Sequence, residues 1–195
     1  MMLDSGNILR LGGLGVGGEE PFEGANLAGA DLRSARLVRA HLKHANLDGA
    51  CLDSADLTGA FLWEASLCNT SLVGACLALS TLYGADATRA DLSDCDLNGA
   101  NLVEAHLQQA KLSGADLSDA LLWDADLRDA QLNGALLLDA DLCRACLRGA
   151  DLRGADLTGA VLIGSELAGA LYDERTQWPN GFNPMGRQLI LRTTL

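Results

Sequence analysis

The sequence predicts an all-β fold in which short extended segments wind into one narrow solenoid. Three observations support this: a small residue recurs at every fifth position from Ala25 to Ala170, a leucine stands two residues after nearly every one of them, and no insertion breaks the phase. Self-similarity at a fixed short period is the signature of a repeat architecture. The 195 residues are therefore expected to form one elongated domain with a thin core.

The five-residue period excludes a helix and fits extended segments. Twenty-six of the thirty small positions hold Ala, and twenty-eight of the twenty-nine positions from Leu27 to Leu167 hold Leu, with Ala87 as the exception. Five residues advance about 140° around a helix, which would spread the leucines over its whole circumference. In an extended segment, residues two apart point to the same side, and the next small residue, three further on, requires a corner.

The residues at the expected corners suit a turn. Gly occupies the second position after the leucine in thirteen of twenty-nine units, where a permissive backbone is useful. Asp or Asn is frequent just before the leucine, where a short polar side chain forms hydrogen bonds with the nearby backbone. Each pentapeptide is therefore expected to form one short wall segment followed by one corner.

Residues 25–172 closely resemble the pentapeptide repeat family, whose motif is A(D/N)LXX. Segments 25–29 (Ala-Asn-Leu-Ala-Gly) and 155–159 (Ala-Asp-Leu-Thr-Gly) show the unit. The resemblance implies a right-handed quadrilateral parallel β-helix, with four pentapeptides in each coil of about 20 residues and about 7.5 coils in all. It also implies that the leucine and the small residue point inward.

A column of residues twenty apart supports the four-walled coil and suggests a binding surface. The residues that follow the leucine on one wall are Lys43, Trp63, Tyr83, Val103, Trp123, Cys143 and Ile163. Five of these seven are large and apolar, and Phe61, Leu121 and Val161 border them, whereas steps of fifteen residues from Trp63 give no such stripe. Monomers seldom expose large apolar patches, so the stripe is interpreted as an interface for a homodimer or another protein. The alternative is a ladder of stacked side chains that only reinforces the sheet.

The ends of the chain depart from the repeat. Residues 1–24 are Gly-rich and are expected to be an N-terminal leader or cap, and residues 173–195 a C-terminal cap or tail that resembles the tails of many family members. Solenoids need caps because an open last coil exposes unpaired strand edges. Trp178 and Phe182 are interpreted as a plug over the last leucine layer.

The charge is strongly acidic and concentrated in the middle of the repeats. The net charge is -12, which disfavours direct binding to nucleic acid or to an anionic membrane. Residues 45–127 hold thirteen acidic and two basic residues, a net of -11. One expected column contains Asp56, Asp96, Asp116 and Asp156.

The acidic column admits two interpretations. Some members of the resembling family are DNA mimics that bind DNA gyrase and protect it from quinolones. Alternatively, Asp is simply the usual residue before the leucine, and a soluble rod needs charge. Leu136 interrupts the column, and the tail lacks the long apolar helix by which such mimics dimerise.

Motifs for catalysis or for ligands are weak. Gly13-x-Gly15-x-x-Gly18 matches a dinucleotide fingerprint, but Glu19 and Glu20 follow it and no crossover unit comes after. Cys143 and Cys146 lack a second pair for a zinc site. His41 and His44 flank Leu42 close to Lys43, which works against a cation. We expect no enzyme, cofactor, metal or small-molecule substrate.

The sequence therefore predicts an interaction scaffold whose partner is another protein or a second copy. A gyrase-directed DNA mimic and a structural spacer without a partner are the alternatives. The six cysteines do not form the framework of a small secreted domain, and neither a signal peptide nor a membrane-spanning stretch is evident, so the cytoplasm is the expected compartment.

Overall fold

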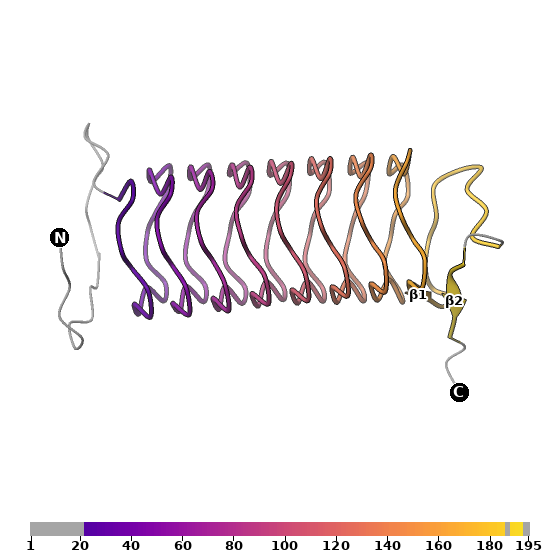
Figure 1. Ribbon diagram of the computed structural model, residues 1–195, viewed down its shortest axis with the longest axis horizontal. Helices are drawn as coiled ribbons and strands as arrows, with labels where there is room; N and C mark the ends of the chain where they lie inside the picture. The colour runs from indigo at the N-terminus through magenta and orange to yellow at the C-terminus, as the bar shows by residue number, and fades with distance from the viewer. Residues whose placement is uncertain (1–21, 186–187, 193–195) are drawn as a thin grey trace.

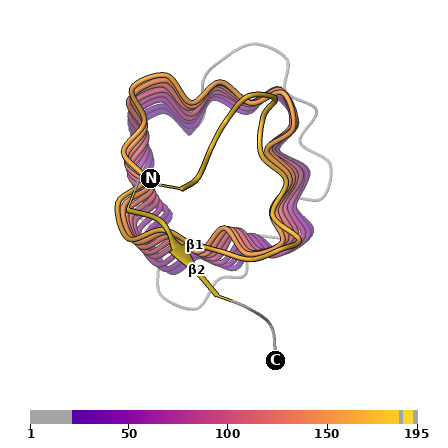
Figure 2. The same ribbon diagram turned by 90° about the vertical axis from the view of Figure 1, so that its right-hand side faces the viewer.

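The computed structural model describes residues 22–185 and 188–192, which form a straight shaft of stacked coils (Figure 1). Viewed along the shaft, the coils superpose as a four-sided tube (Figure 2). The fold is the right-handed quadrilateral parallel β-helix that the sequence predicts. The dinucleotide-like glycine pattern at residues 13–18 lies outside the described residues.

Parallel bridges connect residues twenty apart, from Asn26 with Asn46 to Asp151 with Leu171. Each coil therefore contains four pentapeptides and adds about 4.8 Å to the shaft. The four walls are named by their first central leucine: the first wall starts at Leu27, the second at Leu32, the third at Leu37 and the fourth at Leu42. The residues before and after each leucine face outward.

Every corner is a turn closed by one backbone hydrogen bond. At the first complete corner, the N–H of Ala30 donates to the carbonyl of Leu27 at 3.0 Å. The second residue after the inward central residue, which is nearly always leucine, has a positive φ at each such position from Gly24 to Gly169, for example +67° at Gly29 and +58° at Leu79. This requirement explains the glycines of the repeat, although sixteen corners use another residue.

The core consists of the inward leucines and small residues, most of them fully buried. The exceptions to Ala at the small positions adapt to the interior in different ways. The Thr70 hydroxyl donates to the carbonyl of Leu47 at 2.7 Å, and the Cys95 thiol donates to that of Leu72 at 2.8 Å. Ala87 stands in the leucine column between Leu67 and Leu107 and is 2% exposed.

The C-terminal end changes the register and closes the shaft. Strand β1 (Leu171–Tyr172) pairs in parallel with β2 (Ile190–Leu191), as labelled in Figure 1. The bridge of Asp156 with Gln177 spans one residue more than the coil repeat. Trp178 and Phe182 stack with ring centroids 4.7 Å apart and pack against the core. No helix in the described part of the chain is long and apolar enough to cross a membrane.

Candidate interaction surface

The fourth wall carries the apolar stripe predicted from the sequence, and we call it the aromatic wall. Bridges stack the residues before the leucine, including His41 with Phe61 and Leu121 with Asp141. The carbonyls of Trp63 and Trp123 each accept a backbone N–H from the preceding coil, at 2.9 and 2.8 Å. Residues separated by twenty in the chain thus become direct neighbours on one outer surface.

The stripe is not continuous but forms two apolar clusters, with a third exposed pair at the C-terminal end. Phe61 and Trp63 are 40% and 44% exposed, and three coils further Leu121 and Trp123 are 44% and 47% exposed. Two coils lie between these clusters, and their outward side chains on this wall are half-buried: Thr81, Tyr83, Asn101 and Val103. Val161 and Ile163 form the third exposed pair.

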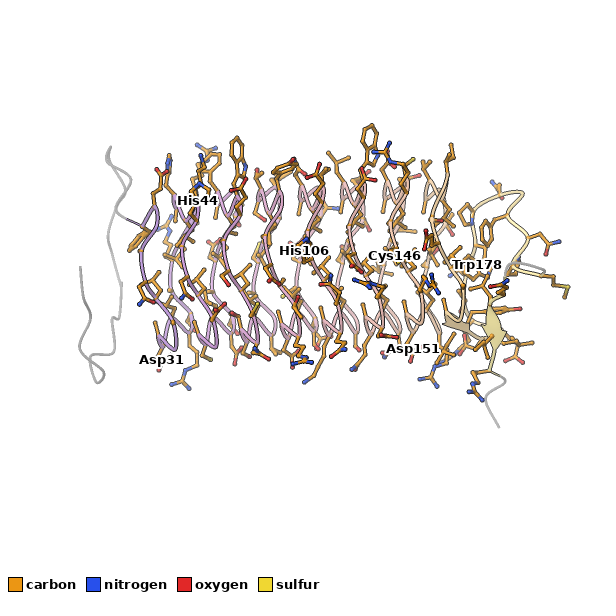
Figure 3. The ribbon with its side chains drawn as sticks, viewed as in Figure 1. Asp31, His44, His106, Cys146, Asp151 and Trp178 are labelled. Atoms are coloured by element: carbon orange, nitrogen blue, oxygen red, sulfur yellow. The ribbon has the colours of Figure 1, made fainter. Side chains whose placement is uncertain are left out.

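Polar side chains frame the first cluster and fix its geometry. The Lys43 ammonium lies 5.7 Å from the ring centroid of Trp63, and the rings of His41 and Phe61 lie 4.9 Å apart. Nδ1 of His44 lies 3.3 Å from the carboxylate of Glu64, at a corner of the shaft that Figure 3 marks by the His44 label. The Tyr83 hydroxyl donates to Glu104 at 2.9 Å. This hydrogen bond raises the pKa of Tyr83.

A surface depression of about 500 Å³ lies beside the Trp63 ring. Its lining comes from four neighbouring coils and comprises Lys43, His44, Trp63, Glu64, Thr81, Tyr83 and Asn101. The sequence pattern already placed Lys43, Trp63 and Tyr83 in one column, but it did not single out Glu64, Thr81 or Asn101. The twenty-residue spacing could have found Thr81 and Asn101, because they share the column of Phe61.

The predicted acidic column lies on the third wall. Bridges connect Asp56 and Asp96 through Cys76, and Asp116 and Asp156 through Leu136, so two non-acidic residues interrupt the column. Each of the four carboxylates accepts the backbone N–H two residues on, for example Asn98 to Asp96 at 3.0 Å and Ser118 to Asp116 at 2.9 Å. One oxygen of each carboxylate therefore supports its own turn, and the other contributes charge to the surface.

The two cysteines of the Cys143-x-x-Cys146 pattern lie on different walls. Cys143 lies on the fourth wall and Cys146 on the first, where its thiol is 3.9 Å from the carboxylate of Glu166. A second depression of about 650 Å³ is lined by Cys146 and by three arginines, Arg128, Arg144 and Arg148. Among the described residues, no group of three or more His, Cys, Asp or Glu side chains is placed to hold a metal ion.

These features define a quadrilateral β-solenoid whose distinctive side chains lie on its outer walls. The sequence profile of the pentapeptide repeats matches in eight copies over residues 22–59, 52–82, 80–119, 100–137, 115–159 and 136–171. The chain therefore belongs to the pentapeptide repeat family.

Solved structures of this fold are similar to the chain to different degrees. HetL of Nostoc sp. strain PCC 7120, a pentapeptide repeat protein involved in heterocyst differentiation regulation, is 34% identical, with a TM-score of 0.52 and coverage of 80% of this chain and 77% of HetL. Rfr23 of Cyanothece 51142 is 42% identical over 48% of this chain and 63% of its own, with a TM-score of 0.47.

A third structure shares the fold alone. The plasmid-mediated fluoroquinolone resistance protein QnrB1, in a trypsin-treated variant form, has a TM-score of 0.63 at 16% identity and covers 88% of this chain and 84% of its own. No curated protein sequence matches the chain significantly.

Proposed function

We propose that the chain is a non-enzymatic scaffold that binds a protein through its aromatic wall. The observation that carries this proposal is the exposure of Trp63 and Trp123, at 44% and 47%, on one wall. Large apolar patches are uncommon on monomers, and Trp and Tyr dominate the binding energy of interfaces. The depression beside Trp63 supplies a shallow recess for an apolar side chain of the partner.

The architecture supports surface recognition rather than catalysis. Catalysis needs a nucleophile, a base and an orienting group that converge in a pocket. Leucine and alanine side chains fill the described coils, and both depressions lie on the outer surface. The scaffold role includes no cofactor, metal or small-molecule substrate.

The similarity to HetL suggests a regulatory role for the proposed scaffold. HetL is involved in heterocyst differentiation regulation, and its fold matches this chain at 34% identity. We extend to this chain only a role in regulation, which it would exert through the protein contact proposed above. The cytoplasm is its proposed compartment, where the partly exposed thiols of Cys51, Cys68 and Cys76 would stay reduced.

Site-directed photo-crosslinking in cells tests the scaffold role. A photoreactive phenylalanine analogue replaces Val103 at the centre of the aromatic wall, and the control carries the same group at Ser113, ten residues further on and on the second wall. We expect a covalent protein adduct from position 103 that disappears when Trp63 and Trp123 are both changed to Glu. Equal adducts from both positions, or none from position 103, would favour a spacer without a partner.

The regular carboxylates of the third wall favour a second candidate, a DNA-mimicking binder of DNA gyrase. An Asp96→Asn/Asp116→Asn variant removes two charges but keeps an oxygen that accepts the hydrogen bonds from Asn98 and Ser118. If the protein is a mimic, it inhibits or protects gyrase in a supercoiling assay, and the variant loses much of that effect. No effect of the unchanged protein on gyrase rules the mimic out.

A further inference from the structure

The aromatic wall has a pattern that matches itself when the shaft is turned end for end. Its midpoint lies between the coils of Thr81 and Asn101, which carry small or half-buried side chains. The cluster of Phe61 and Trp63 lies in the coil before Thr81, and the cluster of Leu121 and Trp123 lies in the coil after Asn101. The two clusters are therefore equally far from the midpoint. A two-fold axis through this midpoint would therefore place apolar clusters opposite one another.

We infer that a second copy of this chain docks antiparallel on the aromatic wall. The two-fold axis would lie in the interface, parallel to the wall segments and perpendicular to the shaft. Rotation about it reverses the direction of the shaft, and each column of outward-facing residues then faces the same column of the second copy. This inference rests on the proposed scaffold function and names the partner. Phe61 faces Leu121 of the second copy, and Trp63 faces Trp123 of the second copy, twice in each dimer.

The surface shape of the aromatic wall fits this arrangement. Trp123 of the second copy stands over the coil of Trp63, next to the depression of about 500 Å³ that Lys43, Trp63 and Tyr83 help to line. The rings of Trp63 and Trp123 are the bulky features, while the two central coils are flatter because Tyr83 and Val103 are half-buried. A projecting ring thus meets a recess on each side of the axis, which is the complementarity that a docked interface needs.

Charge selects the antiparallel direction. In the coil before the Phe61 and Trp63 cluster, the wall carries His41 and Lys43. In the coil after the Leu121 and Trp123 cluster, it carries Asp141. The antiparallel dimer places Lys43 diagonally across from Asp141 of the second copy, at both ends of the interface. A parallel dimer would instead bring Lys43 toward His41 of the second copy, in the same coil. For a rod with a net charge of -12, this pairing offsets part of the mutual repulsion.

The acidic corners beside the wall do not oppose this arrangement. Glu64 would approach Asp124 of the second copy, but each of these carboxylates already has a side-chain partner in its own chain, an imidazole for Glu64 and a guanidinium for Asp124. His44 lies 3.3 Å from Glu64, and the Arg144 guanidinium donates to Asp124 with an Nε–Oδ1 distance of 2.8 Å. The bond from Arg144 lowers the pKa of Asp124.

The interface is narrow, so the dimer is expected to be weak. The six coils from His41 to Asp141 span about 24 Å, and each wall is only one pentapeptide wide. Such a contact buries less than about 1,200 Å² in total, which is the range of transient complexes. We expect a dissociation constant in the micromolar range and a monomer at nanomolar concentration.

Sedimentation velocity across about 1–300 µM tests the proposal, because this range spans a micromolar dissociation constant. We expect Lys43→Glu and Asp141→Lys each to weaken dimerisation about tenfold or more, and the double variant to regain most of it. Lys111→Glu, a matched charge reversal on the second wall, leaves the dimer unchanged. Recovery in the double variant shows that loss in the single variants is not a folding defect.

The outcomes separate this proposal from the scaffold function. A monomer throughout the concentration range, or a dimer whose charge reversals do not compensate, overturns the antiparallel dimer. If position 103 then still crosslinks to a different protein, the scaffold function stands. If neither a dimer nor an adduct at position 103 forms, both proposals fail.

Discussion

Single residues at the small positions show how closely each coil depends on the one before it. Thr70, Cys95 and Thr176 each donate to the carbonyl of a leucine in the preceding coil, at 2.7, 2.8 and 2.9 Å. Burial raises the pKa of the Cys95 thiol to about 12, so that residue stays protonated and acts as a donor. A polar group is tolerated inside the shaft when it reaches such a carbonyl.

Ser80 breaks this rule, and its replacement should stabilise the protein. Its hydroxyl oxygen is buried without a hydrogen-bond partner in the described structure, and Ala60 and Ala100 occupy the same position in the adjoining coils. We expect Ser80→Ala to raise the free energy of unfolding by about 1 kcal/mol, because an unsatisfied buried hydroxyl is removed. Urea denaturation measures this, with Thr70→Ala as a control that should lower stability. A loss on Ser80→Ala would show that the hydroxyl has a partner.

Ala87 offers a second residue-scale prediction. It is the one position from Leu27 to Leu167 where the inward leucine is missing, and it is 2% exposed between Leu67 and Leu107. Filling an empty leucine site should stabilise the shaft by about 2–5 kcal/mol, the usual cost of the reverse change. Thermal melting of Ala87→Leu checks this. A lower melting temperature would show that neighbouring side chains already fill the space.

At the scale of elements, the last corner differs from the others because it is built around a buried carboxylate. Asp173 is 2% exposed and accepts the N–H of Gly154 at 2.9 Å, the N–H of Arg175 at 3.1 Å and the Arg175 guanidinium at 2.8 Å. Burial acts to raise the pKa of Asp173, but these hydrogen bonds outweigh it and the pKa lies below the ordinary value. The corner absorbs the extra residue between Asp156 and Gln177.

Asp173 should therefore make the C-terminal end sensitive to acid. Because its folded pKa is lower than its unfolded pKa of about 3.9, its stabilisation is present above that value and is lost as pH falls through the folded pKa. We expect Asp173→Asn to lower the free energy of unfolding by about 1–3 kcal/mol at neutral pH, and the gap from the unchanged protein to shrink near pH 3. Urea midpoints at both pH values measure it. Glu174→Gln is the exposed control, and an equal effect there would contradict the assignment.

The pentapeptide pattern predicted the walls and corners but not the contacts between coils. The spacing of Leu27 and Ala30 is enough to predict an inward leucine and a turn, because both follow from local backbone geometry. The number of walls came from family resemblance. The division of the stripe into clusters at Trp63 and Trp123, and the carbonyl bonds of Thr70, depend on side-chain conformations set by residues about twenty apart. A local pattern does not determine those conformations.

On the scale of the whole molecule, the shaft is a one-dimensional stack. Bridges connect each coil only to the coils before and after it, from Asn26 to Gln177. Stability in such a stack is close to a sum of coil and neighbour terms, so the ends open more easily than the middle. The cap of Tyr172, Trp178 and Phe182, which Figure 3 places at the C-terminal end by the Trp178 label, should limit that opening.

Removing the cap should loosen the C-terminal coil and leave the middle of the shaft intact. The rings of Trp178 and Phe182 pack against the core cluster, and their loss removes the contact of Trp178 with the ring of Tyr172 in β1, at 5.8 Å between centroids. We expect Trp178→Ala/Phe182→Ala to raise amide hydrogen exchange at least tenfold over residues 152–172, with no change near Leu102. Exchange measured by mass spectrometry tests this, with Trp123→Ala on the outer wall as a control that preserves protection at the end. Uniform loss of protection along the shaft would show that the solenoid unfolds as one cooperative unit, and that the cap stabilises every coil equally.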